Sequence, residues 1–177
     1  MSSRNTPVLS VSPGEKFQLE TEDCYNGNLR KSEDIFTEAM RRTVNPATGQ
    51  VFVKGAHPGD ILRVEILKIV VRNFAVMHVE RGLGVPANFV TGAETSRFPI
   101  GKGKIAVDRG IRLPVRAMIG VIGTAPAKAL VGNSIPGEHG GNMDCSEITA
   151  GTSIYLPVNT EGALLAAGDL HALFCLL

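Results

Sequence analysis

The sequence contains no tryptophan, and aromatic residues make up only 5% of it. It also lacks a basic stripe, because 18 lysines and arginines are balanced by 17 acidic residues. Nucleic-acid binding relies on clustered positive charge and, for single strands, on aromatic stacking, so no nucleic-acid partner is expected. No apolar run is long enough to span a membrane. The first residues lack the charged start and apolar core of a secretion signal.

Cysteine is scarce as well. The three cysteines, Cys24, Cys145 and Cys175, form no CxxC pair. An odd number of cysteines without a secretion signal is typical of a reducing compartment, so we expect a cytoplasmic protein. Cys145 lies near His139 in the sequence and could serve as a nucleophile. A buried, inert thiol is the commoner role of such a cysteine.

Glycine and proline are plentiful, with 20 and 10 residues, and they separate short apolar runs. The hydrophobic fraction of 44% supports a core, and 177 residues suit one domain. Short β-prone runs at close spacing predict a mostly β fold, a sandwich or barrel with a few short helices. We expect residues 1–16 to form an N-terminal tail and residues 17–177 to form a single β-rich domain.

Individual segments can be assigned from their periodicity. Residues 17–21 and 61–71 alternate apolar and polar side chains, which predicts strands. Residues 152–158 form an apolar, β-prone run bounded by glycine and polar residues. Residues 32–42 carry a helical apolar stripe behind Ser32, a suitable N-cap, and predict a short helix.

Residues with metal-binding chemistry gather in the last third of the chain, where apolar runs end. They are His139, Asp144, Asp169 and His171. Carboxylate oxygen and neutral imidazole nitrogen bind zinc and hard divalent cations, and a catalytic zinc lowers the pKa of its water. Asp169 and His171 would face the same way if that stretch is extended. The alternative is that the aspartates stabilise turns and the histidines are ordinary loop residues.

Several motifs, in one order along the chain, resemble the acetamidase/formamidase family. They are residues 22–27 (EDCYNG), 45–49 (NPATG), 120–126 (GVIGTAP), 140–144 (GGNMD), 155–158 (YLPV) and 168–172 (GDLHA). The resemblance implies a β-rich fold and a metal-assisted site. It further implies hydrolysis of short linear amides, such as formamide and acetamide, to a carboxylate and ammonia.

The resemblance also implies residue roles. The implied metal ligands are Asp144 and His171, with His139 and Asp23 beside them, and the implied metal is zinc. The implied substrate-binding residues are Gly141 and Asn142. In the family the segment after the His-Ala pair continues through a Gly-Asp-Gly-Glu motif, whereas here five apolar residues follow and the sequence stops. We therefore expect the chain to correspond to the N-terminal portion of the family's fold, truncated at its C-terminus.

Amide hydrolysis needs an acid that protonates the leaving amine. The family's motif glutamate is missing, so Glu138 and Glu147, which are close in sequence, become the catalytic candidates. Strands that would pair with a missing segment leave open edges, and open edges favour self-association. We expect a weak or inactive amidase that forms a homo-oligomer. The alternative is a non-catalytic remnant that acts only as a self-associating β domain.

Overall fold

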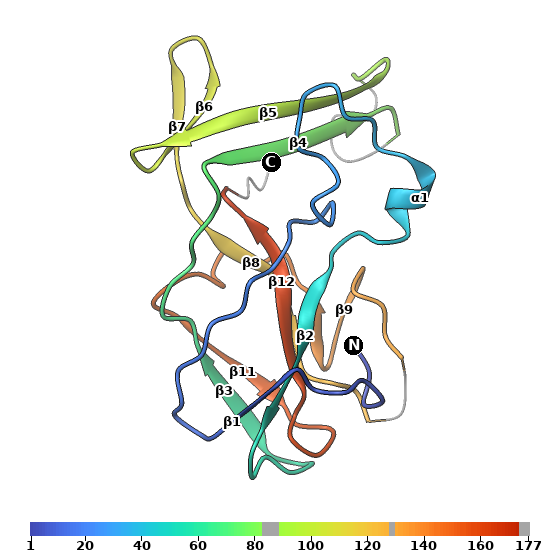
Figure 1. Cartoon of the computed structure of the whole chain (residues 1–177), viewed down its shortest axis with the longest axis vertical. Helices are drawn as coiled ribbons and strands as arrows, with labels where there is room; N and C mark the ends of the chain where they lie inside the picture. Colours follow the sequence, from blue (N-terminus) through green and yellow to red (C-terminus); the bar gives the residue numbers. More distant parts are fainter. Residues whose placement is uncertain (83–88, 128–129, 174–177) are drawn as a thin grey trace.

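The computed structural model describes residues 1–82, 89–127 and 130–173, and Cys175 lies outside this range. Within it the fold is mostly β, as the sequence predicted, and its one helix, α1, spans only Glu38–Arg41. No helix of the described residues is long and apolar enough to cross a membrane. Figure 1 shows a tall body of strands with a separate arm of strands across its upper end.

A six-stranded sheet forms the body, in the order β1-β2-β12-β8-β10-β9. Its strands are β1 (Leu9–Val11), β2 (Ala47–Val53), β12 (Leu165–His171), β8 (Met118–Gly123), β10 (Gly140–Asn142) and β9 (Pro136–Gly137). β1 pairs with β2 in parallel, and the other pairs are antiparallel. β12 lies between β2 and β8, so the C-terminal run of the described chain is a central strand.

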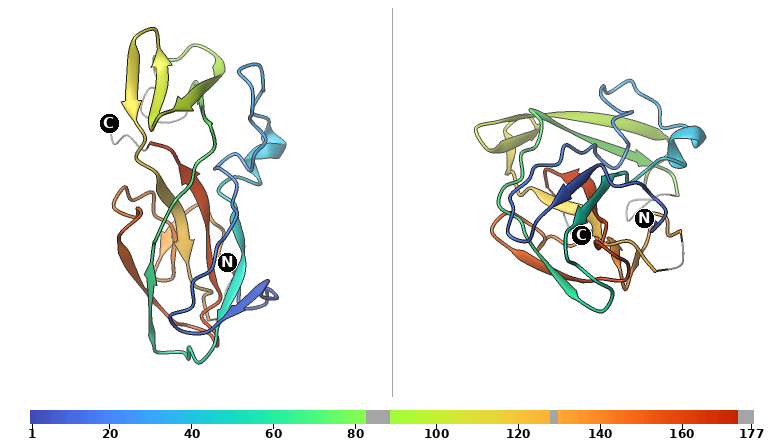
Figure 2. Two further views of the ribbon diagram at one scale, coloured as in Figure 1. Left: turned by 60° about the vertical axis from the view of Figure 1, so that its left-hand side comes forward. Right: turned by 60° about the horizontal axis from the view of Figure 1, so that its bottom comes forward.

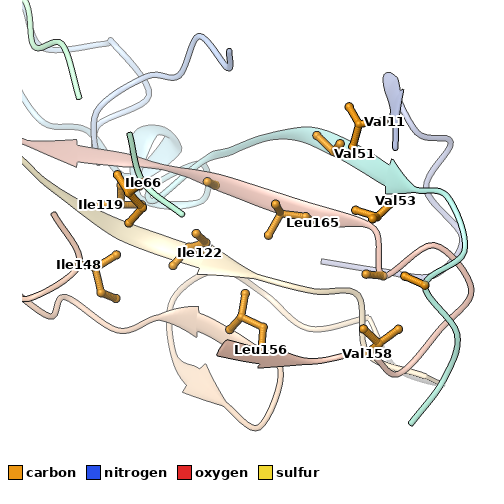
Figure 3. Close-up of a cluster of buried hydrophobic side chains, with 13 residues drawn as sticks. Val11, Val51, Val53, Ile66, Ile119, Ile122, Ile148, Leu156, Val158 and Leu165 are labelled. Carbon is orange, nitrogen blue, oxygen red and sulfur yellow. The ribbon is translucent and has the colours of Figure 1, made fainter. Parts of the chain in front are cut away.

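A second, two-stranded sheet packs against the body and encloses the core. It consists of β3 (Ile61–Glu65) and β11 (Ser153–Pro157). Figure 3 shows Ile122 and Leu165 of the large sheet on one side of the core, with Leu156 and Val158 on the other. Each fully buried aliphatic side chain of this kind contributes about 1.5–3 kcal/mol to folding. The two layers correspond to the sandwich that the sequence predicted.

The arm is a four-stranded antiparallel sheet. It consists of β4 (Phe74–Glu80), β5 (Ala93–Gly101), β6 (Lys104–Asp108) and β7 (Ile111–Pro114), in that order. Figure 2 shows the arm at one end of the body, with the segment around α1 beside it. The outer edge of β4 has no strand partner in the described sheet, so groups from elsewhere in the chain can bond to it.

The segment from residue 17 to residue 42 differs from the sequence predictions. Residues 17–21 form no strand, and only Glu38–Arg41 of the expected helix over 32–42 is helical. Asp34 accounts for the late start, because its Oδ2 accepts the backbone N–H groups of Arg30 and Lys31 at 2.6 and 2.8 Å. This local bonding competes with a helix. Thr37 caps α1 in place of Ser32.

Residues 1–16, expected as a tail, take part in the packed fold. β1 pairs with β2 in register from Leu9↔Val51 to Val11↔Val53, and Val11 is buried in the core. Met1 is also buried, against Val121. The apolar residues of this segment are too few to show a strand period, which is why the sequence pattern missed them. The expected strand over residues 61–71 is shorter than predicted, since β3 ends at residue 65.

Candidate metal site

Asp144, Asp169 and His171 converge where β12 ends beside β8. One ligand atom from each residue, a carboxylate oxygen or an imidazole nitrogen, lies within 4.8 Å of the other two. Asp169 and His171 belong to β12, and Asp144 follows β10 by two residues. Asp169 is 2% exposed, whereas the other two side chains are half-buried. The group is therefore a partly enclosed set of two carboxylates and one imidazole.

The backbone of β12 departs from regular strand geometry at Asp169. Gly168 pairs with Val121 and Leu170 with Ile119, but Asp169 has a φ of 55° and is in register with no residue of β8. Its N–H donates instead to the carbonyl of Glu22 at 3.2 Å. Irregularities of this kind redirect a side chain and recur beside functional sites. Asp169 is thus turned out of the ladder.

Asp144 is held to the same part of β8 by its own backbone. The N–H groups of Met143 and Asp144 both donate to the carbonyl of Gly120, at 2.9 and 3.1 Å. Asp144 also has a left-handed backbone, with a φ of 44°. Aspartate tolerates this conformation better than most residues. Because both N–H groups bond to the Gly120 carbonyl, the backbone of Asp144 is held close to Asp169.

Gly120 leaves the space that the two carboxylates occupy. A Cβ atom on this residue would lie 2.8 Å from Oδ2 of Asp169 and 2.9 Å from Oδ1 of Asp144. Contacts this short would displace one or both side chains. Gly120 is required here because of this close approach, and the sequence motif around it gave no hint of the role.

The electrostatics of the group fit a cation. Among the described residues, Oδ1 of Asp144 and Oδ1 of Asp169 are buried and accept no hydrogen bond. The pKa of Asp169 rises to about 6: burial is the main cause, His171 opposes the rise, and the charges of Asp144 and Asp23 add to it. Buried carboxylates are normally paired or coordinate metals. Two unsatisfied carboxylate oxygens beside an imidazole match the donor set of zinc or another divalent cation.

His171 is oriented by the strand that carries it. Its Nδ1 lies 3.2 Å from the carbonyl oxygen of Asp169 and 3.7 Å from Oδ1 of the same residue. An Nδ1–H that donates to a carbonyl leaves the lone pair on Nε2. Metal-binding histidines are commonly oriented in this way.

Asp23 lies near the group but is not one of the three. Its Oδ1 accepts the N–H groups of Tyr25 and Gly27, both at 3.0 Å, and so caps the 22–27 turn. Its charge nevertheless reaches Asp169, whose pKa it raises. Asp23 therefore adds negative charge at the edge of the site.

His139 also lies outside the group of three. It is buried, and its Nε2 has no partner among the described residues. Burial lowers its pKa, and the N-terminal ammonium lowers it further. The ring lies against Gly141, where a Cβ would be 3.3 Å from Nε2. This histidine thus has a separate environment, near the N-terminus.

The remaining sequence candidates take different positions. Glu138 and Glu147 are both exposed. Asn142 donates from Nδ2 to the carbonyl of Ser134 at 3.4 Å, while its Oδ1 has no described partner. Gly141 pairs with Ile122 in the large sheet. The spacing of residues in the sequence suggested Asp169 as a ligand. The family resemblance did not imply a ligand role for it. The bond from Asp169 to Glu22 could not be found from sequence, because the two residues are far apart in the chain.

Comparisons with known proteins are consistent along the whole chain. The family model described as Acetamidase/Formamidase family matches residues 5–135 and 132–174. The crystal structure of an acetamidase from Bacillus halodurans superposes with a TM-score of 0.95 and 43% identity, over 99% of this chain and 59% of that one. A protein of Thermoanaerobacter tengcongensis superposes with a TM-score of 0.93 and 44% identity, over 98% of this chain and 58% of that one.

A curated relative gives the same result at lower identity. An acetamidase of Mycolicibacterium smegmatis is 24% identical, over 93% of this chain and 56% of the relative. The chain therefore spans a little over half the length of the relatives that it matches. Because the family model covers nearly all of the sequence, the chain belongs to the Acetamidase/Formamidase family.

Proposed function

We propose that this chain carries part of the active site of a metal-dependent amidase that hydrolyses short linear amides, such as formamide and acetamide, to a carboxylate and ammonia. Asp144, Asp169 and His171 bind the metal, and zinc is the metal we favour. The observation that carries the proposal is the pair of buried carboxylate oxygens that accept no hydrogen bond from the described residues, beside His171. Membership of the family supplies the reaction class.

A divalent cation held by these residues would polarise the amide carbonyl and lower the pKa of water. The chain's own contribution is to keep the ligands in place. The Gly120 carbonyl fixes the backbone of Asp144, and the Glu22 carbonyl fixes that of Asp169. Ligands held by rigid strands lose little freedom when the metal binds, which favours affinity and a defined geometry.

Two further residues are proposed to complete the surroundings of the cation. Asp23 caps its turn with Oδ1, so its second carboxylate oxygen is the atom that could approach the site. His139 is the alternative proposed in the sequence analysis. Its Nε2 lacks a described partner, but its ring lies outside the group of three. We favour Asp23, because its charge already acts on Asp169.

Substrate contacts are proposed for Gly141 and Asn142. The Oδ1 atom of Asn142 has no described partner, so it can accept a hydrogen bond from the NH₂ group of a primary amide. Asn142 precedes Asp144 by two residues in the chain and ends β10. Gly141, which has no side chain, would leave room for the substrate next to Asn142.

The leaving amine needs a proton, and Glu138 and Glu147 are the proposed donors in this chain. Both are exposed, so each can exchange protons with solvent. Replacing the donor by glutamine should lower turnover by about 10²–10⁴ and leave the metal content unchanged. The glutamine variant of the other residue serves as the matched control.

A second candidate function is self-association without catalysis. The outer face of the β3–β11 sheet exposes Ile61 and Tyr155, each 64% exposed. Apolar side chains grouped on one face are typical of a contact surface. Analytical ultracentrifugation of wild type and of Tyr155→Ser would test this, because a dimer that uses this face should dissociate in the variant.

The deciding experiment combines metal content with activity. Elemental analysis of the purified chain should find about one divalent cation per molecule. Ammonia release from formamide, acetamide and propionamide, measured with zinc supplied, tests for the reaction. Absence of metal together with absence of ammonia release, in protein shown to be folded by circular dichroism, would refute the proposed function and favour the self-associating domain.

A further inference from the structure

The 22–27 turn is hydrogen-bonded to two strands, β12 and β4, which belong to different sheets. On one side the Glu22 carbonyl accepts the N–H of Asp169 in β12 at 3.2 Å. On the other side the Tyr25 hydroxyl accepts the N–H of His78 in β4 at 3.0 Å. The turn therefore connects the candidate site to the arm, and Asp23 lies between the two fastening points.

The bond to His78 satisfies an N–H group that the arm leaves open. β4 is the edge strand of the arm, and a strand edge presents N–H groups that need partners. The Tyr25 hydroxyl supplies an acceptor at that edge. A single hydroxyl thus links β4 to the turn, two residues after Asp23.

The side chain of His78 is itself immobilised by a buried polar network. Its Nδ1 lies 3.0 Å from Oγ1 of Thr95 and its Nε2 lies 3.2 Å from Oε2 of Glu80. Glu80 in turn accepts a hydrogen bond from Nη2 of Arg41 at 2.6 Å, and the same guanidinium also contacts its Oε1. The network joins the arm to α1, so the donor strand cannot easily shift along its length.

Aromatic contacts hold the ring of Tyr25 in the same place. Its centroid lies 5.6 Å from that of Phe36 in an edge-to-face arrangement, and the Phe36 ring lies 5.2 Å from the His78 ring. The Arg41 guanidinium stacks over Phe36 at 4.7 Å. Aromatic pairs and cation–π contacts each favour a defined ring position. The hydroxyl therefore meets the His78 N–H in one fixed geometry.

From these contacts we propose that Tyr25 is a positioning residue, whose hydroxyl uses the arm to hold the 22–27 turn, and with it Asp23, against Asp169. Removing the hydroxyl would loosen the turn from β4 while the ring contacts stay. The bond from Asp169 to Glu22 would then open more often, and Asp23 would lose its fixed distance from the site. The consequence for metal binding rests on the proposed function, whereas the consequence for the turn does not.

The test is the Tyr25→Phe variant, compared with Tyr155→Phe. The chain has only two tyrosines, and Tyr155 is exposed on β11 without a described hydrogen bond at its hydroxyl, so the second variant is a matched control. Hydrogen exchange followed by NMR, on metal-free protein, should show the Asp169 and Gly27 amides exchanging about 3- to 10-fold faster in Tyr25→Phe, the range for one lost hydrogen bond. The amides of β8 should be unaffected in both variants.

A zinc titration against a chromophoric chelator provides the second readout. We expect the Kd of zinc to rise about 3- to 10-fold in Tyr25→Phe and to stay unchanged in Tyr155→Phe. Unchanged exchange at Asp169 would overturn the proposal. Faster exchange with an unchanged Kd would show that Tyr25 holds the turn without serving the site, which overturns the positioning role. If wild type binds no zinc, the metal proposal fails, and the exchange data alone decide whether Tyr25 holds Asp169.

Discussion

Asp169 in β12 and Asp144, two residues after β10, approach one another, and both have left-handed backbones, with φ values of 44° for Asp144 and 55° for Asp169. Each aims a carboxylate oxygen at the space above Gly120. Left-handed aspartates cost free energy unless the surrounding structure holds them. Two of them at one point, each with an oxygen that no described residue bonds, are best explained by a ligand that compensates the cost.

Replacing Asp144 by alanine should strongly lower the metal content. The variant loses one of the three proposed ligand residues, and a missing ligand should cost more than the 10- to 100-fold in affinity lost with an outer partner. Elemental analysis after dialysis against a limiting zinc concentration measures the effect. Asp108→Ala is the control, because Asp108 is exposed on the arm. Equal metal content in both variants would show that Asp144 is not a ligand.

Gly120→Ala should weaken the site without removing any ligand. The new methyl group would lie 2.8 Å from Asp169 and 2.9 Å from Asp144, so the carboxylates must move apart. We expect the Kd for zinc to rise and the free energy of unfolding to fall by about 1–3 kcal/mol. Gly101→Ala is the control, since a Cβ at that position meets nothing within 4 Å. A Kd equal to that of wild type would contradict the crowded geometry.

The stability of the metal-free protein should depend on pH through Asp169. Its pKa rises from the ordinary 3.8 to about 6 in the folded state, chiefly through burial. The folded state therefore binds the proton more tightly than the unfolded state, so stability is greatest at low pH and falls as the pH rises from about 4 to 6. At about 1.4 kcal/mol per pKa unit, the loss is at most about 3 kcal/mol.

Urea unfolding of chelator-treated protein at pH 4.5 and pH 7.5 measures this dependence. Asp169→Asn keeps the shape of the side chain but cannot ionise, so the part of the pH dependence that comes from Asp169 should disappear in this variant. A variant with the same pH dependence as wild type would show that another group causes it.

The mostly β architecture could be predicted from sequence because glycine and proline separate short apolar runs throughout the chain. β8 and β11 follow such runs closely, at Met118–Gly123 and Ser153–Pro157. The expected helix over residues 32–42 is shortened to Glu38–Arg41, and Asp34 instead bonds to backbone N–H groups before it. Local patterns cannot show which of two local bonding schemes a polar residue adopts, and tertiary packing decides between them.

The site was only partly accessible from sequence. Spacing placed Asp169 and His171 on one side of an extended segment, and family-like motifs singled out Asp144. The space at Gly120 and the bond from Asp169 to Glu22 depend on strands that are distant in the chain. Contacts across a sheet leave no periodic trace in the sequence, so they could be found only from the three-dimensional arrangement.

A last prediction concerns stability and follows from the central position of β8 in the large sheet. Ile122 is 1% exposed and lies two residues after Gly120, in the core between the two sheets (Figure 3). Ile122→Ala would leave a cavity, so we expect the free energy of unfolding to fall by about 2–5 kcal/mol. Ile61→Ala, in a side chain that is 64% exposed, should change it by about 0.5 kcal/mol or less. Urea midpoints that shift equally in both variants would contradict the two-layer core.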